Sequence, residues 1–149
     1  MSENDYFKLR RTYEEIEIGE TASWSRKITE EDIKAFAVLI GDKHPIHLDA
    51  EYAKGTMFGG RIAHGMYTAS FFTPLIASRL SGIDGIYVSQ EIKFIGPVRI
   101  GDVITAHAIV TEKDEKKHRI TFSTTVTNQR GELIIDGKGV VAMKPGSGE

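Results

Sequence analysis

The stretch from His64 to Leu80 is the strongest constraint on how this chain can fold, because it is almost free of charge. Arg79 is its one charged residue, and its apolar residues fall on every side of a helix. This length and pattern predict a helix buried on nearly its whole circumference. Pro74 should remove the hydrogen bond to the carbonyl of Ser70, so we expect a kink inside the helix. The apolar positions are Met66, Ala69, Phe71, Phe72, Leu75, Ile76, Ala77 and Leu80.

The segments after this helix alternate apolar and polar residues, which is the pattern of an antiparallel sheet with one wetted face. A twisted sheet that follows a wholly apolar helix can bury that helix by wrapping around it. The sequence therefore predicts an α+β domain in which about five strands surround one central helix. The expected strands span residues 21–28, 86–94, 103–111, 119–127 and 133–143.

An amphipathic helix predicted over residues 30–40 leads into a constrained polar loop. Gly41 is suited to end that helix because it adopts positive φ without a Cβ penalty. Pro45 cannot continue a helix and favours an extended conformation at the residue before it. The loop concentrates one carboxylate and two imidazoles in six positions, namely Asp42, His44 and His47.

Two interpretations fit this loop. Gly-Asp and His-Pro pairs are ordinary in loops, and Asp42 can bond to its own backbone in an Asx turn. That interpretation gives no reason for His47, which is flanked by Ile46 and Leu48 and is expected to point toward an apolar interior. A carboxylate and an imidazole that meet in a dry pocket are suited to general acid–base catalysis. The loop is therefore a candidate catalytic site.

The loop resembles the signature of the hydratase 2 family, the MaoC-like (R)-specific enoyl-CoA hydratases. It reads here Gly41-Asp42-x-x-Pro45-Ile46-His47, with Ala53 five residues further on. The family pattern has Asn where this chain has His44. Two further stretches are similar to family features, Ala63-His64-Gly65-Met66 and Phe94-x-Gly96-Pro97-Val98-x-x-Gly101-Asp102. The resemblance implies a single hot-dog domain over residues 13–144, with an N-terminal arm at 1–12 and a flexible tail at 145–149.

The same resemblance implies a reaction. Family members add water reversibly to a trans-2-enoyl-CoA to give an (R)-3-hydroxyacyl-CoA, and we expect no cofactor. Asp42 and His47 match the family's acid–base pair and are expected to hold one water molecule between them. The backbone N–H of Gly65, where the central helix begins, is the expected donor to the thioester oxygen.

Four residues are candidates for substrate binding. His44 replaces the family's Asn and is a candidate for selecting the acyl group. His64 is the second candidate, although a histidine at a helix start can equally bond to loop backbone. Thr73 matches a position where the family often carries Ser, and its hydroxyl can instead bond to a carbonyl one turn back. Met66 is bulky and is a candidate for limiting acyl chain length.

Other functions fit parts of the pattern. A dehydratase acting on 3-hydroxyacyl groups carried by acyl-carrier protein belongs to the same reaction class. A hot-dog thioesterase is a second alternative, although thioester hydrolysis needs no acid at the α-carbon. A non-catalytic acyl-CoA-binding module is the third. A metal held by Asp42, His44 and His47 is chemically reasonable, but the likeness to metal-free hydratases leads us to expect none.

Composition and net charge limit the classes of partner that this protein is expected to bind. A net charge of −2 with mixed signs provides no basic field for nucleic acid. The chain has no cysteine, no charged-then-apolar leader and no apolar run of about 18 residues. We therefore expect a cytoplasmic protein without a membrane partner, and at least a homodimer because a five-stranded sheet leaves edges to cover. The candidates for binding the anionic coenzyme A are Lys54, Arg61, Lys93 and Arg99, which the sequence does not rank.

Overall fold

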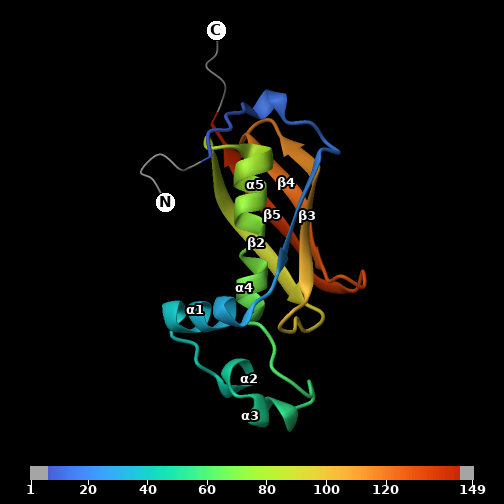
Figure 1. The fold of residues 1–149 in the computed structure, drawn as a ribbon. Helices are drawn as coiled ribbons and strands as arrows, with labels where there is room; N and C mark the ends of the chain where they lie inside the picture. The colour runs from blue at the N-terminus through green and yellow to red at the C-terminus, as the bar shows by residue number, and fades with distance from the viewer. Residues whose placement is uncertain (1–6, 145–149) are drawn as a thin grey trace.

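The structure, a computed structural model, describes residues 7–144, and both the first six residues and the predicted tail at 145–149 lie outside that range. One strand is followed by a run of helices and then by four further strands (Figure 1). In chain order they are η1 (Tyr13–Glu15), β1 (Thr21–Lys27), α1 (Glu30–Ile40), α2 (Pro45–Leu48), α3 (Ala50–Lys54), α4 (Gly65–Ala69), α5 (Phe72–Ile76), the π-helical turn η2 (Ala77–Ser81), β2 (Gly85–Phe94), β3 (Val103–Asp114), β4 (Arg119–Thr127) and β5 (Leu133–Met143).

The five predicted strands form one antiparallel sheet in the order β1-β3-β4-β5-β2. The predicted α+β class and the strand count are confirmed. Alternation in β4 is also confirmed, since every second residue from Ile120 to Val126 is buried and the residues between them are partly exposed. The third strand is longer than expected and reaches Asp114, because pairing with β4 continues to Arg119 after a bulge.

The apolar stretch forms a broken helical column that runs along the sheet (Figure 1). The predicted kink is confirmed and lies between α4 and α5, one turn before Pro74. There the Ser70 carbonyl accepts the backbone N–H of Thr73 at 3.1 Å, in place of the bond that Pro74 cannot make. The helix is therefore interrupted between α4 and α5 without leaving that carbonyl unpaired.

One stripe of this column is exposed, which corrects the prediction that it is buried on nearly its whole circumference. The sheet covers only one side of the column, and the residues at positions i, i+4, i+7 and i+8 of the opposite side face solvent. The predicted substrate-binding residues Met66 and Thr73 belong to this stripe. Its members are Met66, Ser70, Thr73 and Pro74.

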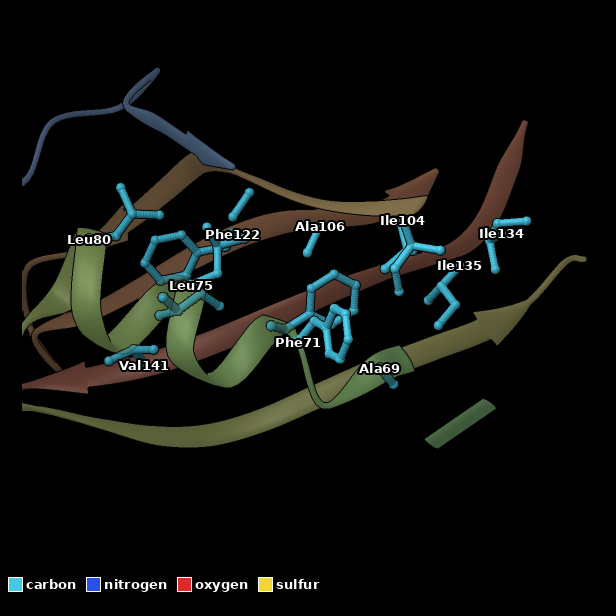
Figure 2. Close-up of a cluster of buried hydrophobic side chains, with 14 of the residues drawn as sticks. Ala69, Phe71, Leu75, Leu80, Ile104, Ala106, Phe122, Ile134, Ile135 and Val141 are labelled. Atoms are coloured by element: carbon cyan, nitrogen blue, oxygen red, sulfur yellow. The ribbon is translucent and has the colours of Figure 1, made fainter. Parts of the chain in front are cut away.

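The core lies between the column and the sheet, as Figure 2 shows. Leu75 and Phe71 project from the helices toward side chains of β3, β4 and β5. Phe122 of β4 is fully buried, while Ala106 of β3 is small and leaves room for the aromatic rings beside it. Burial of this continuous apolar set holds the column against the sheet.

Helices α1, α2 and α3 gather at the end of the column where α4 lies (Figure 1). This arrangement places the loop after α1 next to the start of α4. At the opposite end, the described part of the predicted N-terminal arm is attached, because the Leu9 carbonyl accepts the N–H of Ile83 at 2.9 Å. Within residues 7–144, no helix is both long enough and apolar enough to span a membrane.

Candidate active site

The loop that follows α1 has the backbone that its sequence predicts. Gly41 ends α1 with φ of 82°, and its N–H donates to the Ala37 carbonyl at 2.9 Å. The Asp42 carboxylate accepts the backbone N–H of His44 at 3.2 Å, so the Asx turn is present. One side-chain oxygen of Asp42 is thereby fixed, and the other remains available for chemistry.

His47 lies on a short helix, α2, which corrects the expectation that the whole segment is loop. Pro45 is the first residue of α2, a position that tolerates proline because its N–H would be unpaired in any case. His44 has the predicted extended backbone and caps α2, since its Nδ1 accepts the N–H of Ile46 at 3.0 Å. A helix start that is capped in this way holds His47 in a defined orientation.

Asp42 and His47 face each other. The distance from Asp42 Oδ2 to His47 Nε2 is 3.8 Å, too long for a direct hydrogen bond but short enough for a water molecule about 2.8 Å from each atom to bridge them. The carboxylate is half exposed at 48% and the imidazole is only 11% exposed. The pair therefore sits where solvent meets the protein interior.

The hydrogen bond made by His47 Nδ1 determines the tautomer of the ring. His47 Nδ1 lies 2.8 Å from the carbonyl oxygen of Ile62, which can only accept, so Nδ1 carries the proton. In the neutral ring, Nε2 then presents its lone pair toward Asp42. Burial lowers the pKa of His47 below its ordinary value of 6.5, with a further lowering contribution from His64. Near neutral pH the ring is a base that can accept a proton.

His64 packs against both members of the pair. Its ring stacks on His47 with centroids 3.7 Å apart, and its Nε2–H donates to the backbone carbonyl of Asp42 at 3.0 Å. Phe36 contacts the His64 ring by an edge, with centroids 5.0 Å apart. Only 3% of His64 is exposed, and its Nδ1 has no hydrogen-bond partner within residues 7–144. The structural alternative considered for His64, a bond to loop backbone, is therefore present, and its role in substrate binding stays a prediction.

Gly65 follows His64 directly and begins α4. Neither its backbone N–H nor that of Met66 donates to another residue in the described part of the chain. A Cβ on Gly65 would lie 2.6 Å from Cε1 of Phe94, so the aromatic ring already occupies the space that the missing side chain leaves. Gly65 also lines an apolar cavity of about 520 Å³, with Met66, Phe94 and Ile134 among the other walls. Asp42 and His47 are not among the residues that line this cavity.

Comparison with known proteins identifies the family. The sequence matches the family model described as MaoC like domain over residues 14–131. The chain belongs to the MaoC-like family.

Individual relatives are similar over most of their length. A protein of Rhodospirillum rubrum named (R)-specific enoyl-CoA hydratase is 43% identical over 136 residues, which cover 91% of this chain and 93% of the relative. A 3-hydroxybutyryl-CoA dehydratase of Methylorubrum extorquens is 36% identical and covers 87% of this chain and 82% of that protein. The structure of unliganded R-hydratase PhaJ1 from Pseudomonas aeruginosa superposes with a TM-score of 0.84 at 38% identity, over 91% of this chain and 86% of that one. The predicted hot-dog fold is thereby confirmed.

This MaoC-like chain does not bring every predicted site residue together. His64 joins Asp42 and His47, whereas Thr73 is exposed and its hydroxyl donates to the Ser70 carbonyl at 2.9 Å. That bond is the structural alternative considered for Thr73. Met66 is 58% exposed beside the apolar cavity, and His44 acts as a helix cap at the edge of the site.

A metal does not fit the geometry of this cluster well. Asp42, His47 and His64 each place one possible ligand atom within 4.8 Å of the others. The rings of His47 and His64 are stacked 3.7 Å apart with 23° between their planes, so an ion in the plane of one ring would lie out of the plane of the other. One nitrogen of His44, the other predicted ligand, already accepts the N–H of Ile46.

Two groups that support His47 could not be read from the sequence as its partners. The first is the carbonyl of Ile62, because no sequence signal marks a backbone acceptor. The second is Arg61, a predicted coenzyme A contact, whose Nε donates to the His47 carbonyl at 2.7 Å. Arg61 Nη1 also pairs with Glu30 of α1 at 2.9 Å, which ties α1 and α2 to the segment before α4.

Proposed function

We propose that this chain catalyses the reversible addition of water to a trans-2-enoyl-CoA, giving an (R)-3-hydroxyacyl-CoA. The observation that carries the proposal is the facing pair of Asp42 Oδ2 and His47 Nε2 at 3.8 Å, with the lone pair of His47 directed by the Ile62 carbonyl. The names of the MaoC-like relatives support it. A positioned acid or base of this kind contributes about 10²–10⁴-fold to a rate.

The proposed chemistry uses one water molecule between the two side chains. One member of the pair takes a proton from the water as its oxygen bonds to the β-carbon of the enoyl group. The pair then delivers that same proton to the α-carbon, so that both additions occur on the same face and both side chains return to their starting protonation. While it is held, this proton belongs to the pair rather than to one side chain.

Charge that develops on the thioester oxygen needs a hydrogen-bond donor. The Gly65 N–H is our candidate because it makes no other hydrogen bond in the described chain and follows the His64 that contacts both members of the pair. One such donor is typically worth about 2.7–4 kcal/mol in the transition state. The apolar cavity beside Gly65 provides surface for the apolar part of the substrate.

The pair also separates the proposed reaction from its alternatives. A thioesterase needs a group that directs water at the carbonyl carbon, and it has no use for a second group that protonates the α-carbon. A non-catalytic binding module needs neither a neutral buried imidazole nor a carboxylate aimed at it. A dehydratase acting on acyl-carrier protein would use the same pair, so the choice between the two carriers depends on the carrier-binding surface.

We also propose that the protein forms a homodimer through β2. This strand is at one edge of the sheet, and apolar side chains along it and just beyond it are exposed. Unpaired edges and exposed apolar patches favour association. The exposed apolar residues are Ile86, Val88, Phe94 and Ile95. A cytoplasmic location stays a prediction.

The direct test is incubation of the purified protein with crotonyl-CoA. We expect the enoyl absorbance to fall and the product to be (R)-3-hydroxybutyryl-CoA by chiral analysis. Release of free coenzyme A would instead indicate a thioesterase, and binding without turnover would indicate a silent module. Crotonyl attached to acyl-carrier protein, tested at the same concentrations, separates the two carriers.

A further inference from the structure

A second cavity, of about 390 Å³, is lined by positively charged side chains, one of which, Arg61, also donates to the His47 carbonyl. The C-terminal end of α3 contributes Lys54, and the segments around residues 60 and 100 contribute Arg61 and Arg99. One carboxylate, that of Glu51, lines the same cavity. Three basic groups against one acid leave an excess of positive charge facing the cavity.

The backbone around this cavity is held in place. Ile62 forms an isolated antiparallel bridge with Arg99, and the next residue, Ala63, donates its N–H to the Val98 carbonyl at 2.8 Å. The guanidinium of Arg99 lies close to Gly60, where a Cβ would be 3.3 Å from its Nη1. The two arginines therefore come from segments that are hydrogen-bonded to each other.

Part of this charge has no partner of its own. Arg61 uses Nε on the His47 carbonyl and Nη1 on Glu30, but its Nη2 is buried and has no hydrogen-bond partner in residues 7–144. Within the same residues, neither Lys54 nor Arg99 forms an ion pair. The side chains of Lys54 and Arg99 are exposed, so their donors are available to the oxygens of a bound anion.

We propose that the cavity between Lys54, Arg61 and Arg99 binds the phosphate groups of the coenzyme A carried by the substrate. This inference rests on the proposed function and specifies where that substrate's anionic end is held. Guanidinium groups suit phosphate oxygens because they donate two parallel hydrogen bonds, and an ammonium adds a mobile charge. Arg61 lines the cavity and also donates to the His47 carbonyl. One side chain would therefore contribute both to substrate binding and to the orientation of the base. Lys93, the fourth candidate, is on β2 and does not line the cavity.

The test compares Arg99→Ala and Lys54→Ala with the matched control Lys117→Ala, which removes one exposed positive charge from the turn between β3 and β4. We expect KM for crotonyl-CoA to rise about tenfold in each cavity variant, the equivalent of about 1.4 kcal/mol, and to stay unchanged in the control. Arg61 is left intact because it also supports His47. With crotonyl-pantetheine, which lacks the phosphates, we expect the wild type and the cavity variants to have the same KM.

Crotonyl-dephospho-CoA, which lacks the 3′-phosphate, distinguishes which phosphate group of coenzyme A binds in the cavity. A defect that persists with this substrate places the diphosphate in the cavity, and one that disappears places the 3′-phosphate there; both support the proposal. Equal KM values for Arg99→Ala and Lys117→Ala, or an equal loss with crotonyl-pantetheine, would overturn it while the hydratase function stands. Calorimetric binding of coenzyme A itself gives a readout without turnover, and we expect about tenfold weaker binding in each cavity variant than in the control.

Discussion

The imidazole rings of His47 and His64 stack with centroids 3.7 Å apart, and His64 also holds the backbone carbonyl of Asp42 at 3.0 Å. One buried ring thus contacts both members of the proposed acid–base pair and begins the turn that presents the Gly65 N–H. We infer that His64 positions the pair without itself exchanging protons with substrate.

Substitution of His64 separates its two contacts. His64→Phe keeps a flat ring against His47 but loses the donor to the Asp42 carbonyl, whereas His64→Gln can keep the donor and loses the ring. Because small misplacements of reacting groups are costly, we expect each variant to lower kcat about 10–100-fold with a smaller change in KM. Circular dichroism checks the fold, and wild-type kcat in both variants would exclude a positioning role.

Gly65 lacks a Cβ, which leaves room for the Phe94 ring, and its N–H is the donor in the proposed chemistry. Gly65→Ala introduces a Cβ that meets Phe94 at 2.6 Å, and we expect it to lower the free energy of unfolding by about 1–3 kcal/mol. In a Phe94→Ala background the clash is absent, so the same change should no longer destabilise. Urea denaturation of the four proteins measures this coupling. Equal effects of Gly65→Ala in both backgrounds would exclude the ring as the cause.

His44 performs the capping that an Asn would perform at the same position. Because Asn is among the best N-cap residues, we expect His44→Asn to retain stability within about 0.5 kcal/mol, whereas His44→Ala should cost about 1 kcal/mol. Thermal or urea unfolding of both variants measures the difference. Identical stabilities for His44→Asn and His44→Ala would show that the cap contributes nothing.

The lowered pKa of His47 gives activity and stability a common pH dependence. The neutral base persists below pH 6.5, so the acidic limb of kcat/KM should fall below that value. The unfolded chain binds the proton first as pH drops, so this contribution to stability is complete above pH 6.5 and is lost as pH falls below it. His47→Gln should flatten the stability profile in that window. An acidic limb above pH 6.5 would contradict a depressed pKa.

Local pattern was enough to predict the strands, the end of α1 at Gly41 and the break before Pro74. In each case the determining physics acts within a few residues: alternation along a strand, positive φ at a helix end, and a missing N–H. The start of α2 was missed because Pro45 was interpreted only as a terminator, although the first turn of a helix accepts proline.

Contacts between distant residues could not be predicted in the same way. The position of His64 over His47 depends on packing across 17 residues of chain, and its bond to Asp42 spans 22. The exposed stripe that includes Thr73 depends on how far the sheet curls around the helical column. Sequence spacing carries little information on either, so the structure brings Asp42 and His47 of the loop together but leaves Thr73 of the helix exposed.

The most direct measurement is the kcat of Asp42→Asn for the hydration of crotonyl-CoA. Asn is nearly isosteric and its side-chain oxygen can still accept the His44 N–H, so the turn and the fold should be retained. Because Asn can neither take nor give the proton, we expect kcat to fall about 10²–10⁴-fold with unchanged circular dichroism. A variant that kept the wild-type kcat would contradict the proposed role of the Asp42–His47 pair.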